Sequence, residues 1–374
     1  MKKIFKNCSV LIGGSFKKID FSIENGKFSE FGNFDNGTDL NGAYVIPGLF
    51  DIHTHGGAGV CFDNIKKQDF EKIFSYYISQ GATSVLATTT TLSDEQIKCQ
   101  LLVLAKLCET YPIFKGIHLE GPFLSKEYKG AMNENLLQEP NFEKLIEYQK
   151  LARGHIKLIT IAPELMGVTD FIKRANEMGI VVSLGHSGAS YAQANEALDC
   201  GAKSFTHTFN AMKPISHKGE SSILVSALES DAYAEIIADG KHVNRDLFKL
   251  LLKCKGLDKI IGITDSLAEA GLPDGDYLQG DGRIIQKAGG DLFYANSQTR
   301  AGSAIGIFDC LVNFSEFTNK PIEKCARVFT ENPANLLSVY YDKIEKNSAA
   351  NFIVFKDKKL QKVYLAGNCV YGEK

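Results

Sequence analysis

The sequence has no long hydrophobic run and no excess of charge of either sign. No stretch approaches the ~18 apolar residues that a membrane-spanning helix needs, so we expect no membrane association. The 42 Lys and Arg residues nearly balance the 44 Asp and Glu residues, and the net charge of -2 argues against broad binding to nucleic acid. A local basic patch could still bind a small anion, such as a phosphorylated substrate.

The sequence also lacks the marks of an exported protein. Its N-terminal segment, MKKIFKNCSVLIGG, has no apolar stretch of signal-peptide length and no small-residue cleavage site. The nine cysteines are scattered, odd in number and without a Cys-x-x-Cys pair, so they do not indicate a disulfide framework. We interpret them as buried, reduced thiols and predict that the protein is cytoplasmic.

The two ends of the chain resemble one another in composition. Residues 1–48 and 345–374 contain short β-rich segments broken by Gly, Asn and Asp, and neither end could bury its own apolar face. Paired with each other, they would have enough strands for a core. We therefore predict one small, discontinuous β-sandwich built from both termini.

The middle of the chain, residues 49–344, alternates β-rich segments with segments of helical periodicity. Eight such units in series predict an α/β fold of the (β/α)8 TIM-barrel type, with its active site where the strands end. The Gly-rich residues near 267–302 predict a β-hairpin insertion after the eighth strand. The eight candidate strands begin at Val45, Ala82, Phe114, Ile156, Ile180, Lys203, Ala234 and Lys259.

Polar side chains stand at the ends of five of these strands. His53 and His55 close the first strand, and because strand side chains alternate, both imidazoles can face one cation. Glu120 closes the third strand before a Gly-Pro turn, where a buried carboxylate needs a partner that a metal would supply. The fifth, sixth and eighth strands end at His186, His207 and Asp265.

Each of these residues, taken singly, is more often an ordinary polar group than a ligand. His118 shares a strand face with Glu120 and is as consistent with a satisfied structural histidine as with a role beside a metal. Taken together, the polar residues at the strand ends are hard to obtain from unrelated structural needs. We therefore predict a metal-dependent active site at the mouth of the barrel.

The motifs HxH, HLEGPF, GHS, THTFNAM, IADGKHV, TDS, AGLPDG and ENPANLL resemble, in this order, those of the N-acetylglucosamine-6-phosphate deacetylases of the amidohydrolase superfamily. The resemblance runs over nearly the whole chain. It implies that Asp265 is the catalytic aspartate and that one or two divalent metals are bound. It further implies a homodimer, because a residue of the neighbouring subunit completes the phosphate site in that family. The implied ligands are Glu120, His186 and His207, with His53 and His55 as the extra pair of the two-metal members.

The resemblance also implies which residues contact the substrate. His242 matches the histidine that contacts the sugar phosphate, and Asn210 with Ala211 matches a backbone contact to the sugar. Lys218 falls where the family has a phosphate-binding arginine, and a lysine offers charge without the bidentate fork. Met132 stands where a histidine is common. These two departures concern the sugar and its phosphate and leave the hydrolytic residues untouched.

Amide hydrolysis needs a nucleophile, a polarised carbonyl and an acid for the leaving amine. A divalent metal could meet the first two needs, and mixed histidine and carboxylate ligands suit Zn²⁺ best, with Fe²⁺, Co²⁺ or Mn²⁺ as alternatives. Asp265 would transfer the proton.

We therefore predict hydrolysis of N-acetylglucosamine 6-phosphate to glucosamine 6-phosphate and acetate, in amino-sugar catabolism. Three alternatives stay open from the sequence. The substrate could be N-acetylgalactosamine 6-phosphate or another N-acyl compound. The chain could also be a catalytically silent barrel that binds a sugar phosphate.

Overall fold

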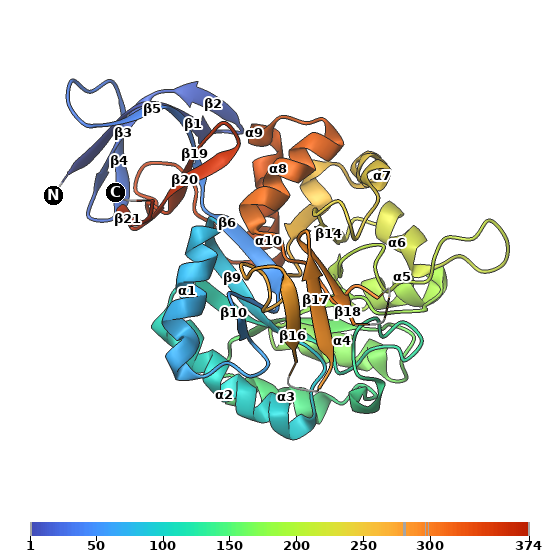
Figure 1. Cartoon of the computed structure of the whole chain (residues 1–374). Coiled ribbons are helices and arrows are strands. Elements are labelled where there is room, and N and C mark those ends of the chain that lie inside the picture. Colours follow the sequence, from blue (N-terminus) through green and yellow to red (C-terminus); the bar gives the residue numbers. More distant parts are fainter. Residues whose placement is uncertain (1, 280–281, 296, 298, 373–374) are drawn as a thin grey trace.

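The computed structural model describes residues 2–279, 282–295, 297 and 299–372. It contains a sheet built from both termini and a barrel with surrounding helices. In Figure 1 the blue N-terminal strands and the red C-terminal strands lie together at one side of the barrel. The chain leaves the terminal sheet at Pro47 and enters the barrel at Leu49.

The terminal strands form one eight-stranded sheet, in which β5 runs parallel to β1 and antiparallel to β19. Phe28 and Phe352 lie on β4 and β19, which three strands separate, yet their ring centroids are 5.6 Å apart. The sheet must therefore curl over itself, which gives the sandwich-like core predicted from the sequence. Its strands are β1 (Lys3–Ile12), β2 (Ser15–Lys18), β3 (Asp20–Glu24), β4 (Lys27–Gly32), β5 (Thr38–Pro47), β19 (Phe352–Lys356), β20 (Lys359–Leu365) and β21 (Asn368–Tyr371).

The middle of the chain forms an eight-stranded parallel sheet rolled into a barrel, as predicted. Its first and last strands meet at their carboxyl ends, where Asp265 N donates to His53 O over 2.9 Å and His55 N donates to Ser266 O over 2.8 Å. These bonds bring the two ends of the barrel sequence together at the site. Its strands are β6 (Leu49–Thr54), β9 (Ala82–Thr89), β10 (Phe114–Glu120), β11 (Ile156–Ile161), β12 (Val181–Leu184), β13 (Ser204–Phe205), β14 (Tyr233–Ile237) and β15 (Ile260–Ile263).

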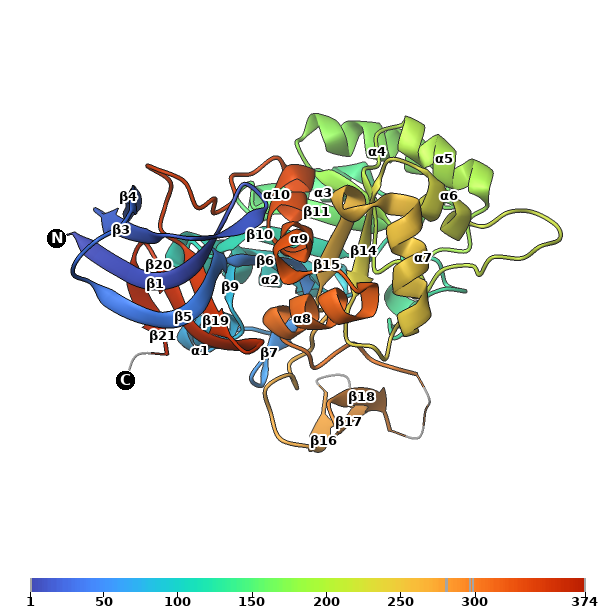
Figure 2. The same cartoon turned by 90° about the horizontal axis from the view of Figure 1, so that it is seen from above.

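Helices cover the outside of the barrel (Figure 2). The helix α2 begins after Ser93, whose hydroxyl oxygen accepts from Gln96 N over 3.3 Å, and such caps satisfy the free amides of a first turn. No helix in the described part of the chain is long and apolar enough to cross a membrane. The helices are α1 (Phe70–Ser79), α2 (Asp94–Thr110), α3 (Phe142–Leu151), α4 (Val168–Glu177), α5 (Tyr191–Asp199), α6 (Ile223–Glu229), α7 (Arg245–Lys255), α8 (Ile307–Thr318), α9 (Ile322–Cys325) and α10 (Glu331–Leu337).

The insertion after β15 is larger than the predicted hairpin. It is a three-stranded antiparallel sheet of β16 (Gly275–Leu278), β17 (Ile284–Ala288) and β18 (Asp291–Tyr294). The third strand forms because Gly289 and Gly290, both with positive φ, make a two-residue turn between the paired residues Ala288 and Asp291. Positions 280–281, 296 and 298 of the predicted insertion lie outside the described residues. Figure 2 shows this small sheet standing apart from the barrel wall.

The cysteines differ in their exposure. All nine are free thiols. Cys8, Cys108, Cys310 and Cys325 are buried, and burial raises the pKa of the Cys108 thiol to about 12. Cys61, Cys200 and Cys369 are only partly buried, and Cys99 and Cys254 are exposed, so the predicted burial is wrong for the last two. Both lie on the outer surface of helices α2 and α7, which the sequence spacing alone did not distinguish from the inner face.

Candidate active site

Glu120 lies at the centre of the site, at the end of β10, and is 2% exposed. Its Oε1 atom is 3.2 Å from His53 Nε2, and its Oε2 atom is 3.2 Å from His55 Nε2. Oε1 is also 3.3 Å from His186 Nε2 and 2.9 Å from His207 Nε2. One buried carboxylate is thus surrounded by four imidazoles from three other strand ends of the barrel. We call these five residues the metal-ligand cluster.

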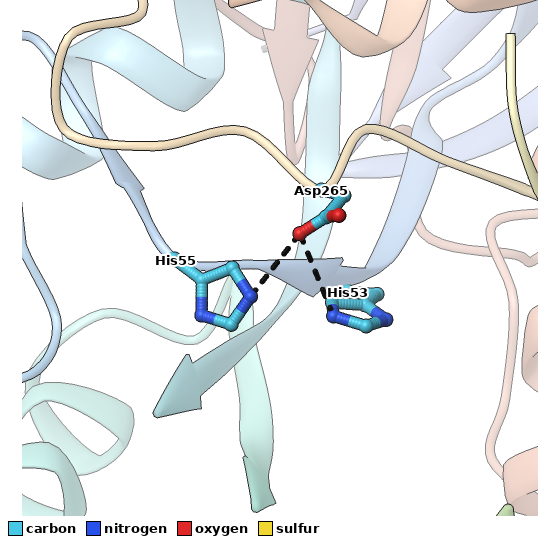
Figure 3. Close-up of side chains that lie close together, drawn as sticks. All are labelled: His53, His55 and Asp265. Atoms are coloured by element: carbon cyan, nitrogen blue, oxygen red, sulfur yellow. Dashed lines mark ion pairs between the residues drawn. The ribbon is translucent and has the colours of Figure 1, made fainter. Parts of the chain in front are cut away.

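Asp265 faces the cluster from the end of β15. Its Oδ1 atom is 3.1 Å from His55 Nε2 and 3.7 Å from His53 Nε2. Figure 3 shows that both imidazoles are joined to this one carboxylate oxygen. The sequence predicted that these three residues would meet, although more than 200 positions separate Asp265 from His55.

Two of the four imidazoles, those of His53 and His186, are also held by acceptors on the side away from the cluster. His53 Nδ1 lies 3.0 Å from Glu235 Oε2, which also accepts the backbone amide of His207 over 3.1 Å. His186 Nδ1 lies 2.9 Å from the carbonyl oxygen of Tyr128. A ring nitrogen that donates to such an acceptor leaves the lone pair of the neutral ring on Nε2. The Nε2 atoms of His53 and His186 face the centre of the cluster. Their lone pairs can therefore coordinate a cation there.

These donor atoms meet the requirements of a metal site. Two groups of three side chains each bring their ligand atoms within 4.8 Å of one another. Neutral imidazoles and carboxylates are ordinary ligands of divalent transition metals. The arrangement therefore fits one or two metal ions. The two groups are His53 with His55 and Asp265, and Glu120 with His186 and His207.

The charges of the site are strongly coupled. Burial acts to raise the pKa of Glu120, but the His53 charge and hydrogen bonds from His186 and His207 hold it well below its usual value. Burial acts to lower the pKa of His55, but hydrogen bonds to Asp265 and Glu120 raise it to about 9. The carboxylates thus favour the protonated, positively charged form of the imidazoles. A divalent cation bound by the cluster would replace these protons as the positive charge.

The backbone is strained at three residues of the site. His186, His207 and Asp265 have φ values of 47°, 29° and 49°, in the left-handed region that side chains beyond Cβ seldom adopt. Each such residue costs about 1–3 kcal/mol and persists only where the surrounding structure enforces it. Each of the three stands two residues after the last residue of a barrel strand. Strain concentrated there supports a functional role for these positions.

A cavity of about 730 Å³ opens above the metal-ligand cluster. Predicted substrate contacts Asn210, Ala211 and His242 line it. Asp239 orients His242, because its Oδ2 atom lies 2.6 Å from His242 Nδ1 and its Oδ1 atom accepts the His242 amide over 2.9 Å. Burial acts to raise the pKa of Asp239, but these hydrogen bonds lower it. The other ring nitrogen of His242 remains available to a ligand.

Lys218 does not line this cavity. It belongs to an exposed loop, residues 214–221, between β13 and α6. The base of the loop is fixed, because Lys213 N donates to Ser187 O over 3.0 Å and Tyr191 N donates to Ser221 O over 2.8 Å. Figures 1 and 2 both show the yellow-green loop projecting away from the barrel. The structure therefore separates Lys218 from His242, which the sequence had assigned to one anion site.

Met132 lies in the cavity wall and is 8% exposed. Its sulfur atom accepts weakly from the amide of Thr91 over 3.5 Å. The neighbouring Gly130 has φ of 56° and passes so close to His186 that an added Cβ would lie 3.2 Å from the ring. The loop that carries Met132 thus forms one wall of the site and contributes a thioether to it.

His118 is an ordinary satisfied histidine in this structure. Its Nε2 atom lies 2.8 Å from Thr160 Oγ1 and its Nδ1 atom 3.4 Å from Thr88 Oγ1. Burial and the positive charge of His53 hold its pKa well below the usual value, so the ring stays neutral. Of the two roles that the sequence left open, the structure favours the structural one.

Sequence reasoning missed several residues of the site. Glu235 is fully buried on β14, and a carboxylate within the apolar strand YAEII is the same signal that identified Glu120. Arg283, Arg300 and Glu269 line the cavity from the insertion. No periodicity marks residues of a Gly-rich insertion, so these three could not be found from the sequence pattern.

Comparison with known proteins agrees with this geometry. The family model of the amidohydrolase family matches residues 44–370. The chain belongs to the amidohydrolase family. Within this family it is 34% identical over 304 residues to the N-acetylglucosamine-6-phosphate deacetylase of Bacillus subtilis, covering 79% of this chain and 76% of that protein.

Two further relatives bear on the substrate. The structure of N-acetyl-D-glucosamine-6-phosphate deacetylase from Mycobacterium smegmatis, in complex with N-acetyl-D-glucosamine-6-phosphate, superposes with a TM-score of 0.93 and 27% identity over 99% of both chains. The N-acetylgalactosamine-6-phosphate deacetylase of Escherichia coli O157:H7 is 28% identical over 81% of this chain and 80% of that protein. Relatives of this amidohydrolase thus act on two epimeric sugars.

Proposed function

We propose that this amidohydrolase removes the acetyl group of N-acetylglucosamine 6-phosphate, giving glucosamine 6-phosphate and acetate in amino-sugar catabolism. The observation that carries the proposal is the complete set of Glu120, four histidines and Asp265 beneath one cavity. The family and its deacetylase relatives support the same reaction. The intact Asp265 argues against a silent binding barrel.

Asp265 is the proposed catalytic residue. Its carboxylate takes a proton from the attacking water while the water oxygen bonds to the acetyl carbon. The carbon–nitrogen bond then breaks, and the same proton passes to the leaving nitrogen, so that acetate and the free amine depart. Asp265 starts the reaction as the ionised base, because its pKa is held below the usual value: burial acts to raise it, but the hydrogen bond from His55 and the charge of His53 lower it.

The metal-ligand cluster would hold the divalent metal. When bound, the metal would polarise the acetyl carbonyl and help to activate the water. We propose Zn²⁺ on the ligand types, with Fe²⁺, Co²⁺ or Mn²⁺ as alternatives. The Glu120, His186 and His207 group would hold one ion, and His53 with His55 would hold a second.

The phosphate is proposed to bind between two subunits. His242 lines the cavity of its own chain, whereas Lys218 is carried outward on the projecting loop. A homodimer in which this loop reaches the partner's cavity would bring the two together, as the resemblance to the deacetylases implies. Asn210 and Ala211 would contact the sugar beside His242.

The free thiols of all nine cysteines support a cytoplasmic location.

The division of the chain supports this arrangement. We propose residues 1–48 with 345–374 as a separate domain and residues 49–344, including the insertion, as the catalytic domain. All residues proposed for the chemistry lie in the second of these.

Acetate release from purified protein tests the proposed function. kcat/KM should be highest for N-acetylglucosamine 6-phosphate and lower for the galacto epimer and for both unphosphorylated sugars. A higher value for N-acetylgalactosamine 6-phosphate would assign the epimer instead, since a relative acts on that sugar. Tight binding of the sugar phosphates without acetate release would leave only the silent barrel.

A further inference from the structure

Glu269 is a buried carboxylate in the cavity wall that the proposed reaction does not use. It follows Asp265 by four residues, in the segment between β15 and the inserted sheet, and is 3% exposed. Its Oε1 atom accepts from Gln279 Nε2 over 2.7 Å. Its Oε2 atom is buried and has no hydrogen-bond partner among the described residues. A buried carboxylate oxygen without a hydrogen-bond partner lowers the stability of the fold unless a ligand or a water molecule donates to it.

The other carboxylates of the cavity are already satisfied. Glu120 and Asp265 face the imidazoles of the cluster. Asp63 accepts from the amide and the hydroxyl of Thr90, over 2.9 and 2.5 Å. Among the acidic residues that line the cavity in the described part of the chain, only Glu269 has a buried oxygen without a partner.

Glu269 is also held in place. Gln279 fixes one of its oxygens, and Lys287 Nζ binds the Glu269 backbone carbonyl over 3.0 Å and the Leu272 carbonyl over 2.5 Å. The Lys287 charge is therefore anchored to backbone oxygens beside Glu269, while the second carboxylate oxygen is buried and has no partner among the described residues. An acceptor that is fixed in the cavity wall favours a ligand whose hydrogen-bond donor lies at the matching position.

We propose that Glu269 accepts a hydrogen bond from a ring hydroxyl of the sugar and so contributes to the choice of sugar. This inference rests on the proposed function, because it assumes that an amino-sugar phosphate occupies the cavity. The phosphate itself is excluded as the partner, since two anions at hydrogen-bond distance repel. A hydroxyl is neutral and can donate, and its position distinguishes one hexose from another.

Deoxy sugars test this assignment directly. kcat/KM is measured for N-acetylglucosamine 6-phosphate and for its 1-deoxy, 3-deoxy and 4-deoxy analogues, with wild type and Glu269→Gln. In wild type one analogue should lose at least about tenfold, because a site built to bind a hydroxyl rejects the analogue that lacks it. In Glu269→Gln the loss for that analogue should shrink to about threefold or less, because the charged acceptor is gone.

Asp274→Asn is the matched control, since Asp274 lies on the same insertion and bonds the amide of Gly289 over 2.9 Å without lining the cavity. It should keep the wild-type pattern. Melting temperature and metal content show whether Glu269→Gln is folded, and the wild-type series alone already tests for a hydroxyl contact. The inference is overturned if no deoxy analogue is rejected by wild type, or if the rejection is unchanged in a folded Glu269→Gln. Failure of the proposed function would look different, because wild type would then release no acetate from the parent sugar.

Discussion

The metal-ligand cluster stands on the ends of barrel strands, whereas Lys218 and Glu269 stand on the loop between β13 and α6 and on the insertion. We call these two segments, residues 214–221 and 267–302, the substrate rim. Each residue of the cluster has partners within the barrel, and Glu120 alone faces four imidazoles. In the rim, Lys218 is exposed and Glu269 has a buried carboxylate oxygen without a partner among the described residues.

The difference indicates that the cluster and the rim have separate roles. Strands fix a few side chains rigidly, which suits bond breaking, because catalysis requires donors and acceptors held in place before the substrate arrives. Loops change in length and composition without disturbing the barrel, so they can adapt the same chemistry to different sugars. Changes in the cluster should therefore affect turnover, and changes in the rim should affect the choice of substrate.

The largest effect is expected in the cluster. His207→Ala removes one of the three ligands in the Glu120 group, so acetate release should fall close to background and metal content should drop. His53→Ala should lower metal stoichiometry to one ion. His155→Ala, at the opposite end of the barrel, is a matched histidine control and should keep both. Unchanged metal content in both cluster variants, measured by elemental analysis, would refute the ligand assignment.

Replacement of Asp265 comes next in size. Asparagine keeps the shape of the side chain but cannot accept the proton from water. Asp265→Asn should therefore lower kcat by about 10²–10⁴, the usual range for general acid–base catalysis. Binding of the substrate, followed by calorimetry, should survive. If kcat stays within a few-fold of wild type, the base is another residue.

Glu235 gives a sharper test of how rigid the cluster must be. It touches no substrate atom in this account but orients His53 and the His207 backbone. Loss of such a partner typically weakens metal binding by about 10–100-fold. Glu235→Gln should show this in a titration with a chelator as competitor, and excess metal should restore much of the activity. A drop in kcat that metal does not rescue would point to a different role.

The smallest effect is expected at Lys218. If it binds the phosphate of the substrate in the partner's cavity, Lys218→Ala should lower kcat/KM for the phosphorylated sugar by about tenfold, the size of one charge-assisted hydrogen bond. The unphosphorylated sugar should be little affected, and Lys218→Arg should keep the preference. Lys249→Ala, on the exposed face of α7, controls for net charge. An equal loss for both sugars would remove Lys218 from phosphate recognition.

The barrel and its cluster could be predicted because both follow from repetition. Eight strand–helix units predict a barrel, and a barrel brings the strand ends to one mouth, so the sequence alone predicts that His53, Glu120 and Asp265 meet. The positive φ angles at His186, His207 and Asp265 could not be predicted, because they are enforced by tertiary contacts that no local pattern shows.

The rim could not be predicted to the same degree. The Gly-rich sequence of the insertion predicted a two-stranded hairpin, whereas the structure has a third strand. Nothing in that sequence indicated that Glu269 or Arg283 would line the cavity. The place of Lys218 outside the cavity of its own chain could not be predicted, because sequence order says little about where a long exposed loop projects. Non-local packing decides such positions, whereas strand ends inherit theirs from the barrel.

Metal removal tests the central claim most directly. The protein is treated with a chelator, its metal content is measured, and acetate release from N-acetylglucosamine 6-phosphate is followed before and after divalent metal is added back. The account predicts that activity falls in proportion to the metal lost and returns with added metal. Full acetate release by demonstrably metal-free protein would contradict it.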